Sequence, residues 1–215
     1  MKKVTLLLLL FFPFYCAEGT FRYYLGGSAE FVMIAGSFDG ESFFEIDNQV
    51  IMVPKIDPGF GFGINGGFRF GNFAIDFQYK RSGHNATLMD GSSTTCNMNV
   101  IKFLGFKSYM GNTHLIKPFI DFDLSGSWIK IAEASYWYDS PANLTWASFG
   151  AVILGLGIGT EIRPHKRIGI EIECLPAWYV GTDTKGIERI NYEITKFGNF
   201  KLDGSLSLIY YFNEK

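Results

Sequence analysis

The chain has 215 residues, a formal net charge of −2 and a pI near 5.9, so it has no basic field of the kind that binds nucleic acid. Aromatic residues make up 17% of the chain and there are 25 glycines, a composition typical of strands and turns rather than of helices. The length is that of a single domain.

The first twenty residues have the pattern of a secretory signal. Lys2 and Lys3 precede an apolar run over residues 6–12, which is too short to cross a bilayer as a mature helix. Small residues near position 19 predict cleavage there, so that residues 1–19 are a signal peptide and residues 20–215 are one domain. Lipidation of Cys16 is an alternative that the bulky residues before it disfavour.

Eight segments follow in which apolar and polar residues alternate, a pattern that predicts strands with one apolar and one polar face. The third segment shows this period best, since Phe73, Ile75, Phe77 and Tyr79 alternate with Ala, Asp, Gln and Lys. The fourth does not alternate cleanly over residues 100–104, which a β-bulge would explain. The predicted strands are 22–35, 59–70, 72–81, 97–110, 115–129, 148–163, 167–180 and 200–212.

The spacers between these strands alternate between short and long. The short ones are 70–72, 110–114 and 163–166, and the long ones are near 36–58, 81–96, 130–147 and 181–199. Bacterial outer-membrane barrels combine short periplasmic turns with long extracellular loops, and an even strand number returns both termini to the periplasm. We therefore predict an all-β fold, an eight-stranded antiparallel up-and-down transmembrane β-barrel located in the outer membrane.

We expect the apolar face to contact lipid and the polar face, rich in Gly, Ser and charged residues, to fill the lumen of the barrel. Charges inside should pair, because an isolated buried charge is costly. A lipocalin-like soluble barrel would reverse the faces, but the polar face has too few Lys and Glu for a solvated exterior. The predicted lumen charge network is Arg69, Asp76, Lys80, Asp121, Asp123, Glu161, Glu171, Glu173, Lys201 and Asp203, with Arg167 as a further cationic partner.

The signal, the eight segments and the closing pattern Leu206-x-Leu208-x-Tyr210-x-Phe212 resemble the small eight-stranded outer-membrane proteins. That group includes OmpX, OmpW, the opacity-type adhesins and the membrane domain of OmpA. The resemblance implies an environment of outer-membrane lipid and recognition of the last strand by the barrel-assembly machinery. In this chain residues 213–215 extend beyond the last aromatic residue, which departs from the pattern of the group.

No catalytic residue, metal site or cofactor is expected. Ser82 and His84 form a candidate nucleophile–base pair in the predicted loop 81–96, but no acidic residue that would orient the histidine is identifiable. The carboxylates of the fifth and seventh strands could bind a cation or take part in acid–base chemistry, but lumen filling is the favoured explanation. Cys96, placed in that loop, and Cys174, placed in mid-strand, are expected to be unpaired.

The predicted outer loops contain aromatic residues, which often mark a contact surface when exposed. Packing of the loops against each other, or a position at the outer membrane interface, explains them equally well. We therefore expect a monomeric, non-enzymatic surface protein with a role in adhesion, host contact or envelope structure, and an extracellular or host molecule as its partner. A narrow channel for ions or small apolar molecules is the alternative, and a lipid-modifying enzyme is less favoured. The candidate contact residues are Phe43, Phe44, Tyr136, Trp137, Tyr138 and Trp146.

Overall fold

The computed structural model describes residues 21–36, 38, 43–46, 49–52, 54–88, 91–111, 115–132, 146–185 and 200–212. The side chains of residues 43–46, 49–52, 146, 147 and 181–185 are not part of this description. The predicted signal peptide therefore lies outside the described residues, as does Cys16, the disfavoured alternative site of lipidation. None of the described residues forms a helix long and apolar enough to cross a membrane.

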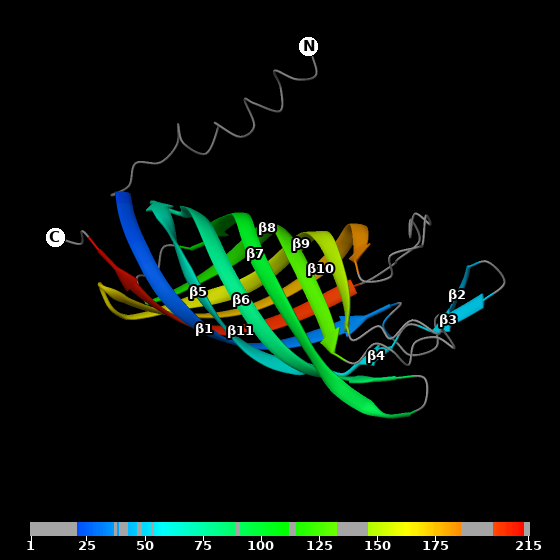
Figure 1. Cartoon of the computed structure of the whole chain (residues 1–215). Helices are drawn as coiled ribbons and strands as arrows, with labels where there is room; N and C mark the ends of the chain where they lie inside the picture. The colour runs from blue at the N-terminus through cyan, green and yellow to red at the C-terminus, as the bar shows by residue number, and fades with distance from the viewer. Residues whose placement is uncertain are drawn as a thin grey trace, which may run out of the picture.

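Eight long strands form one closed antiparallel barrel (Figure 1). The order around the barrel is β6-β5-β1-β11-β10-β9-β8-β7, and pairing of β6 with β7 closes it. Three short strands, β2 (Phe43–Ile46), β3 (Gln49–Met52) and β4 (Lys55–Ile56), lie between β1 and β5. The barrel strands are β1 (Phe21–Ala35), β5 (Gly59–Phe70), β6 (Phe73–Thr87), β7 (Ser93–Tyr109), β8 (Ile116–Ala132), β9 (Trp146–His165), β10 (Ile168–Lys185) and β11 (Phe200–Tyr211).

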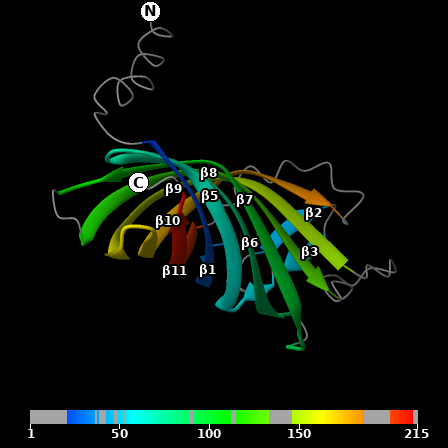
Figure 2. The ribbon, with the colours of Figure 1, turned by 90° about the vertical axis from the view of Figure 1, so that its left-hand side faces the viewer.

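Both ends of the described chain lie at one rim of the barrel, where Tyr24 of β1 is paired with Tyr211 of β11 (Figures 1 and 2). The tight turns lie at this same rim, and the β5–β6 turn holds Gly71 at a φ of 56°, which glycine adopts without strain. The short β2–β3 hairpin lies at the opposite rim. By the convention of short periplasmic turns, the rim with the termini is periplasmic and the other is extracellular.

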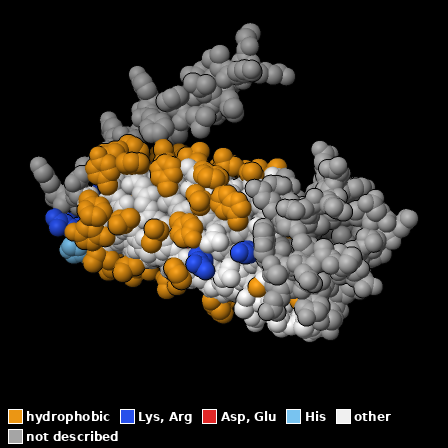
Figure 3. Space-filling model, in the orientation of Figure 1, with side chains coloured by type: hydrophobic (Ala, Val, Ile, Leu, Met, Phe, Trp, Pro, Cys, Tyr) orange, Lys and Arg blue, Asp and Glu red, His pale blue; other side chains and the backbone are white. Residues whose placement is uncertain are grey.

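The faces of the strands are those predicted, with the apolar residues outside. Phe60 is 73% exposed and Ile158 is 66% exposed, and such side chains lie on all eight barrel strands as an apolar belt, one face of which is shown in Figure 3. Lys and Glu are almost absent from the belt, and soluble proteins rarely expose so large a continuous apolar surface to water. The arrangement excludes the lipocalin-like alternative, in which the apolar face would be inside, and it matches a lipid-facing exterior.

The irregular pattern of the fourth predicted strand comes from a bulge in β7, as expected. The register with β8 shifts between Lys102 and Leu104, and the register with β6 shifts between Asp76 and Gln78. One additional residue on β7 changes the phase of the alternation. Val100 and Lys102 point inward before the bulge, and Lys107 and Tyr109 point inward after it.

The prediction of a long loop over residues 81–96 was wrong. β6 and β7 continue as a hairpin in which residues 73–87 pair with residues 93–108, and the tip is closed by the hydrogen bond from Leu88 N to Ser92 O. Cys96 is consequently a buried residue of β7 rather than a loop residue, while Cys174 faces outward on β10, and both thiols are free. The polar residues 81–85 suggested a loop, but those on the inner face are buried in the lumen.

Candidate functional site

The centre of the lumen is occupied by charged side chains arranged around Lys102 of β7. Its ammonium group lies 2.8 Å from the Asp121 carboxylate, 3.4 Å from that of Asp76 and 3.5 Å from that of Asp123. All four side chains are at most 4% exposed. Three carboxylates from two other strands therefore share one cation, a geometry in which each ion pair depends on the others.

Two further lysines make similar clusters on either side of Lys102. Towards the periplasm, Lys107 lies 2.7 Å from Glu171 and 3.5 Å from Glu173 of β10. Towards the cell exterior, Lys80 bridges Glu30 of β1 and Asp203 of β11 at 3.3 and 3.5 Å. Six of the barrel strands thus contribute charges that pair across the lumen. Lys201 also contacts Asp203, at 2.6 Å.

All ten residues of the predicted lumen network point inward and are buried. Three members were not predicted: Glu30, Lys102 and Lys107. The two lysines were missed because the bulge in β7 lies between them and changes the phase of the alternation. The break in alternation over residues 100–104 is the sequence signal that could have identified them. Arg167, predicted to be a partner, is instead exposed in the β9–β10 turn.

Aromatic and charged side chains fill the periplasmic end of the lumen. Arg69 forms a buried ion pair with Glu161, and its guanidinium stacks on the ring of Tyr109, 3.6 Å from the ring centroid. Tyr211 donates a hydrogen bond to Glu161, and Phe119 packs against Tyr109 with 5.3 Å between ring centroids. Stacking and ion pairing together make this end of the barrel solid rather than open.

The extracellular end of the lumen is apolar, which the sequence analysis did not predict. Phe38 and Ile56, from the segment between β1 and β5, cover the inward-facing side chains, and Ile56 N donates to Phe38 O at 3.1 Å. We call this cluster the apolar plug. Its residues are Val32, Ile34, Phe38, Ile56, Ala86, Leu88, Cys96, Met98, Val100, Ile129, Ile131, Phe149, Ile153, Ala177 and Tyr179.

Ser82 and His84 lie inside the barrel between the charges and the apolar plug, not in an outer loop. Ser82 Oγ is 2.8 Å from His84 Nε2, and His84 Nδ1 is 3.0 Å from the carbonyl oxygen of Asp57. A carbonyl only accepts, so the neutral ring has its proton on Nδ1 and Nε2 accepts from the Ser82 hydroxyl. Gly59 provides the space, because a Cβ there would lie 2.7 Å from His84 Cε1.

This pair has the proton arrangement of a nucleophile and base, but both side chains are only 4–5% exposed. Each ring nitrogen has a hydrogen-bond partner, so the arrangement satisfies the polar atoms of a buried histidine. No group of three or more His, Cys, Asp or Glu side chains in the described ranges is placed to hold a metal ion.

The structure describes only some of the predicted contact residues of the outer loops, and these by their backbone alone. Phe43 and Phe44 belong to β2 and Trp146 begins β9, but their side chains are not described. Tyr136, Trp137 and Tyr138 lie outside the described residues, between β8 and β9.

Comparison with known proteins gives matches at the level of structure only. No protein-family model matches the chain, and no curated protein matches its sequence. Neisserial surface protein A superimposes with a TM-score of 0.58 and 12% identity, over 88% of this chain and 97% of that protein. The chain has the fold of the small eight-stranded outer-membrane proteins.

Two further solved structures are more distant. Ail, the attachment invasion locus protein of Yersinia pestis, solved in complex with the heparin analogue sucrose octasulfate, matches at 11% identity and a TM-score of 0.48, over 91% of this chain and 99% of that protein. A major outer membrane protein from Thermus thermophilus matches at 10% identity and a TM-score of 0.47, over 90% of this chain and 100% of that protein. With the apolar belt, the fold locates this barrel in the outer membrane.

Proposed function

We propose that the protein is a monomeric, non-enzymatic surface protein whose extracellular loops contact a molecule outside the cell, while its barrel serves as a closed, rigid scaffold. The observation that supports this proposal is the filled lumen. Charges occupy its centre, an aromatic cluster its periplasmic end and the apolar plug its extracellular end. A scaffold of this kind holds loops at fixed positions on the cell surface.

The filled lumen also weighs against the narrow-channel alternative. The small residues of β5 and β9 suggested space for a solute, but neighbouring side chains occupy that space instead. A Cβ on Gly157 would lie 2.8 Å from Leu175 Cδ1, and a Cβ on Gly63 would lie 2.7 Å from Ser28 Oγ. Eight-stranded barrels enclose just enough room for their own side chains.

We therefore expect the purified protein to show no single-channel conductance in planar lipid bilayers and no uptake of small sugars into liposomes. The physical reason is that ions would have to displace buried ion pairs and then cross the apolar plug. A known porin reconstituted in the same lipids is the positive control. Reproducible conductance steps from folded, heat-modifiable protein would contradict the closed-scaffold part of the proposal.

The loop between β8 and β9 is the part of the chain in which to test surface contact. We expect the Tyr136→Ala, Trp137→Ala, Tyr138→Ala triple variant to reduce adherence of bacteria expressing the protein to epithelial-cell monolayers by at least about tenfold, since loss of even one aromatic anchor at a contact surface costs about 2 kcal/mol. The matched control is the double variant His165→Ala, Lys166→Ala in the β9–β10 turn at the opposite rim. Equal adherence of the two variants, at equal surface amounts, would refute a contact role for this loop.

A further inference from the structure

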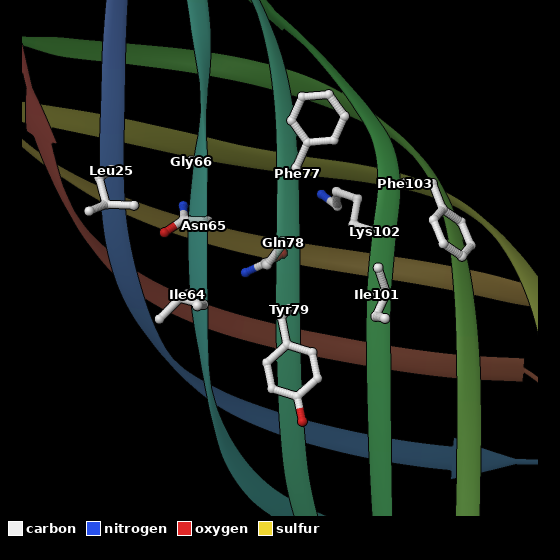
Figure 4. A pocket seen from close by; sticks show the side chains of 10 residues that line it. All are labelled: Leu25, Ile64, Asn65, Gly66, Phe77, Gln78, Tyr79, Ile101, Lys102 and Phe103. Carbon is white, nitrogen blue, oxygen red and sulfur yellow. The ribbon is translucent and has the colours of Figure 1, made fainter.

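The lipid-facing surface of the barrel has a groove across β1, β5, β6 and β7. The groove is shallow and open to the surrounding lipid, with a volume of about 570 Å³. Gly66 forms its floor, since this glycine is paired with Phe77 of β6 and Leu25 of β1 but has no side chain of its own. Figure 4 shows the walls, which are the apolar side chains of Leu25, Ile64, Phe77, Tyr79, Ile101 and Phe103.

The lining of the groove is hydrocarbon, although three polar residues contribute to it. Asn65, Gln78 and Lys102 are at most 8% exposed, and their side chains belong to the lumen. A groove of this composition in the middle of the apolar belt fits an acyl chain, the one flexible hydrocarbon that surrounds the barrel in a membrane.

The extracellular edge of the groove is polar. Tyr79, in the groove wall, donates from Oη to Asn99 Oδ1 at 2.9 Å on the outer face of β7. Two exposed cations follow towards the cell exterior. Arg81 is the next lipid-facing residue after Tyr79 on β6, and Lys130 is the next after Trp128 on β8. Since Arg81 is paired with Asn99 and Lys130 with Asn97, two amides lie between the two cations.

Strand geometry fixes the distance between these cations. They lie two strands and two residues apart, so their Cα atoms are separated by about 12 Å. Side chains of this length can hold two anionic groups several ångströms apart, or converge towards one. The side-chain amides of Asn97 and Asn99 between them are suited to hydroxyl groups.

Among the residues whose side chains are described, the charges at this edge are positive, which favours an anion. Of the nine acidic residues whose side chains are described, eight point into the lumen, and the ninth, Asp57, lies 3.8 Å from Lys55. Lys and Arg side chains, but no acidic ones, are visible at the edge of the belt on the described part of the face in Figure 3.

We propose that this surface is a binding site for a phosphorylated glycolipid of the outer leaflet. One acyl chain lies in the groove over Gly66, phosphate groups contact Arg81 and Lys130, and sugar hydroxyls contact Asn97 and Asn99. Two separated cations with amides between them suit a sugar head group with two phosphates better than a glycerophospholipid with one. The site is on the lipid side of the barrel and is independent of the loop contacts proposed above.

The test is native mass spectrometry of the folded protein released from micelles that contain bisphosphorylated lipid A, enzymatically dephosphorylated lipid A or phosphatidylglycerol. We expect the wild-type protein to retain the bisphosphorylated lipid about tenfold more than either alternative, because charge-assisted hydrogen bonds to phosphate are lost in one and a second phosphate is absent from the other. This comparison requires no variant. Equal retention of all three lipids would overturn the proposal, and a preference for phosphatidylglycerol would assign the surface to phospholipid.

Two variants locate the site. Arg81→Gln with Lys130→Gln should lower retention of the bisphosphorylated lipid by about tenfold, whereas Lys166→Gln with Arg167→Gln, which removes the same charge at the periplasmic rim, should leave it unchanged. Gly66→Leu fills the groove without changing a charge and should also weaken retention. All these positions face outward, and the gel shift on boiling confirms folding for each. Unchanged retention in both Arg81→Gln, Lys130→Gln and Gly66→Leu would overturn the assignment.

Discussion

Replacement of Lys102 by methionine is expected to lower the free energy of unfolding by about 3–5 kcal/mol, the largest effect we expect from any single lumen substitution. The variant retains the aliphatic stem but removes the cation that Asp76, Asp121 and Asp123 share. Three carboxylates then face one another in a lumen from which bulk water is excluded. Without a cation or water to solvate these carboxylates, the loss of stability comes from uncompensated buried charge rather than from lost packing.

Urea unfolding of the protein in lipid vesicles, followed by tryptophan fluorescence, measures this change. Lys166→Met in the exposed β9–β10 turn is the control, and it should change the free energy by less than about 0.5 kcal/mol. Adding Asp121→Asn to Lys102→Met should recover part of the loss, because one of the three uncompensated carboxylates is removed. A loss below about 1 kcal/mol for Lys102→Met would mean that the network is solvated well enough not to need its cation.

The sequence was sufficient to predict the barrel because the alternation of side chains reports directly on which face is buried. The predicted strand 59–70 coincides with β5, and the range 22–35 differs from β1 by one residue. Spacer lengths added the orientation, since short turns and long loops alternate along the chain. Side-chain alternation and spacer length are both properties of short stretches of the chain, so one sequence is enough to show them.

The loop predicted over residues 81–96 was wrong because the local pattern of side chains does not distinguish a loop from a lumen-facing strand there. Polar residues near position 82 predicted a loop. A strand of this barrel also has polar residues, on the face that points into the lumen, so the composition of this segment does not distinguish a strand from a loop. Ser82 and His84 were placed at the outer rim for this reason. A loop residue and a lumen-facing strand residue are distinguished by the neighbour on the paired strand. The register that pairs His84 with Cys96 is a property of the tertiary fold and cannot be read from the local sequence.

The residues expected to face the lumen did not include three members of its charge network, Glu30, Lys102 and Lys107. Alternation assigned the acidic residues of β8 and β10 to one face, but Lys102 and Lys107 lie on either side of the bulge in β7, and no single phase includes both. The apolar plug was missed for another reason. Its residues point inward at the extracellular end, where an apolar inner face contradicts the simple rule of apolar residues outside.

Replacement of Gly67 by alanine is expected to destabilise the barrel by about 1–3 kcal/mol, although it adds a single methyl group. A Cβ at this position would clash with the carbonyl oxygen of Ile75 on the paired strand β6, and it would lie 2.8 Å from Tyr24 Oη and 2.9 Å from Asp76 Cα. Two of these neighbours are backbone atoms, so β5 and β6 must separate for the methyl group to fit.

Gly204→Ala is the matched control, because a Cβ on this glycine of β11 has no neighbour within 4 Å. Its free energy of unfolding should change by less than about 0.5 kcal/mol in the same urea titration. A second consequence follows from the pairing of Gly67 with Asp76, whose carboxylate contacts Lys102. If the methyl group displaces β6, it weakens that ion pair, so the losses from Gly67→Ala and Lys102→Met should sum to more than the loss in the double variant. Strict additivity would show that the two strands absorb the methyl group without moving Asp76, and that close backbone packing and the charge network stabilise the barrel independently.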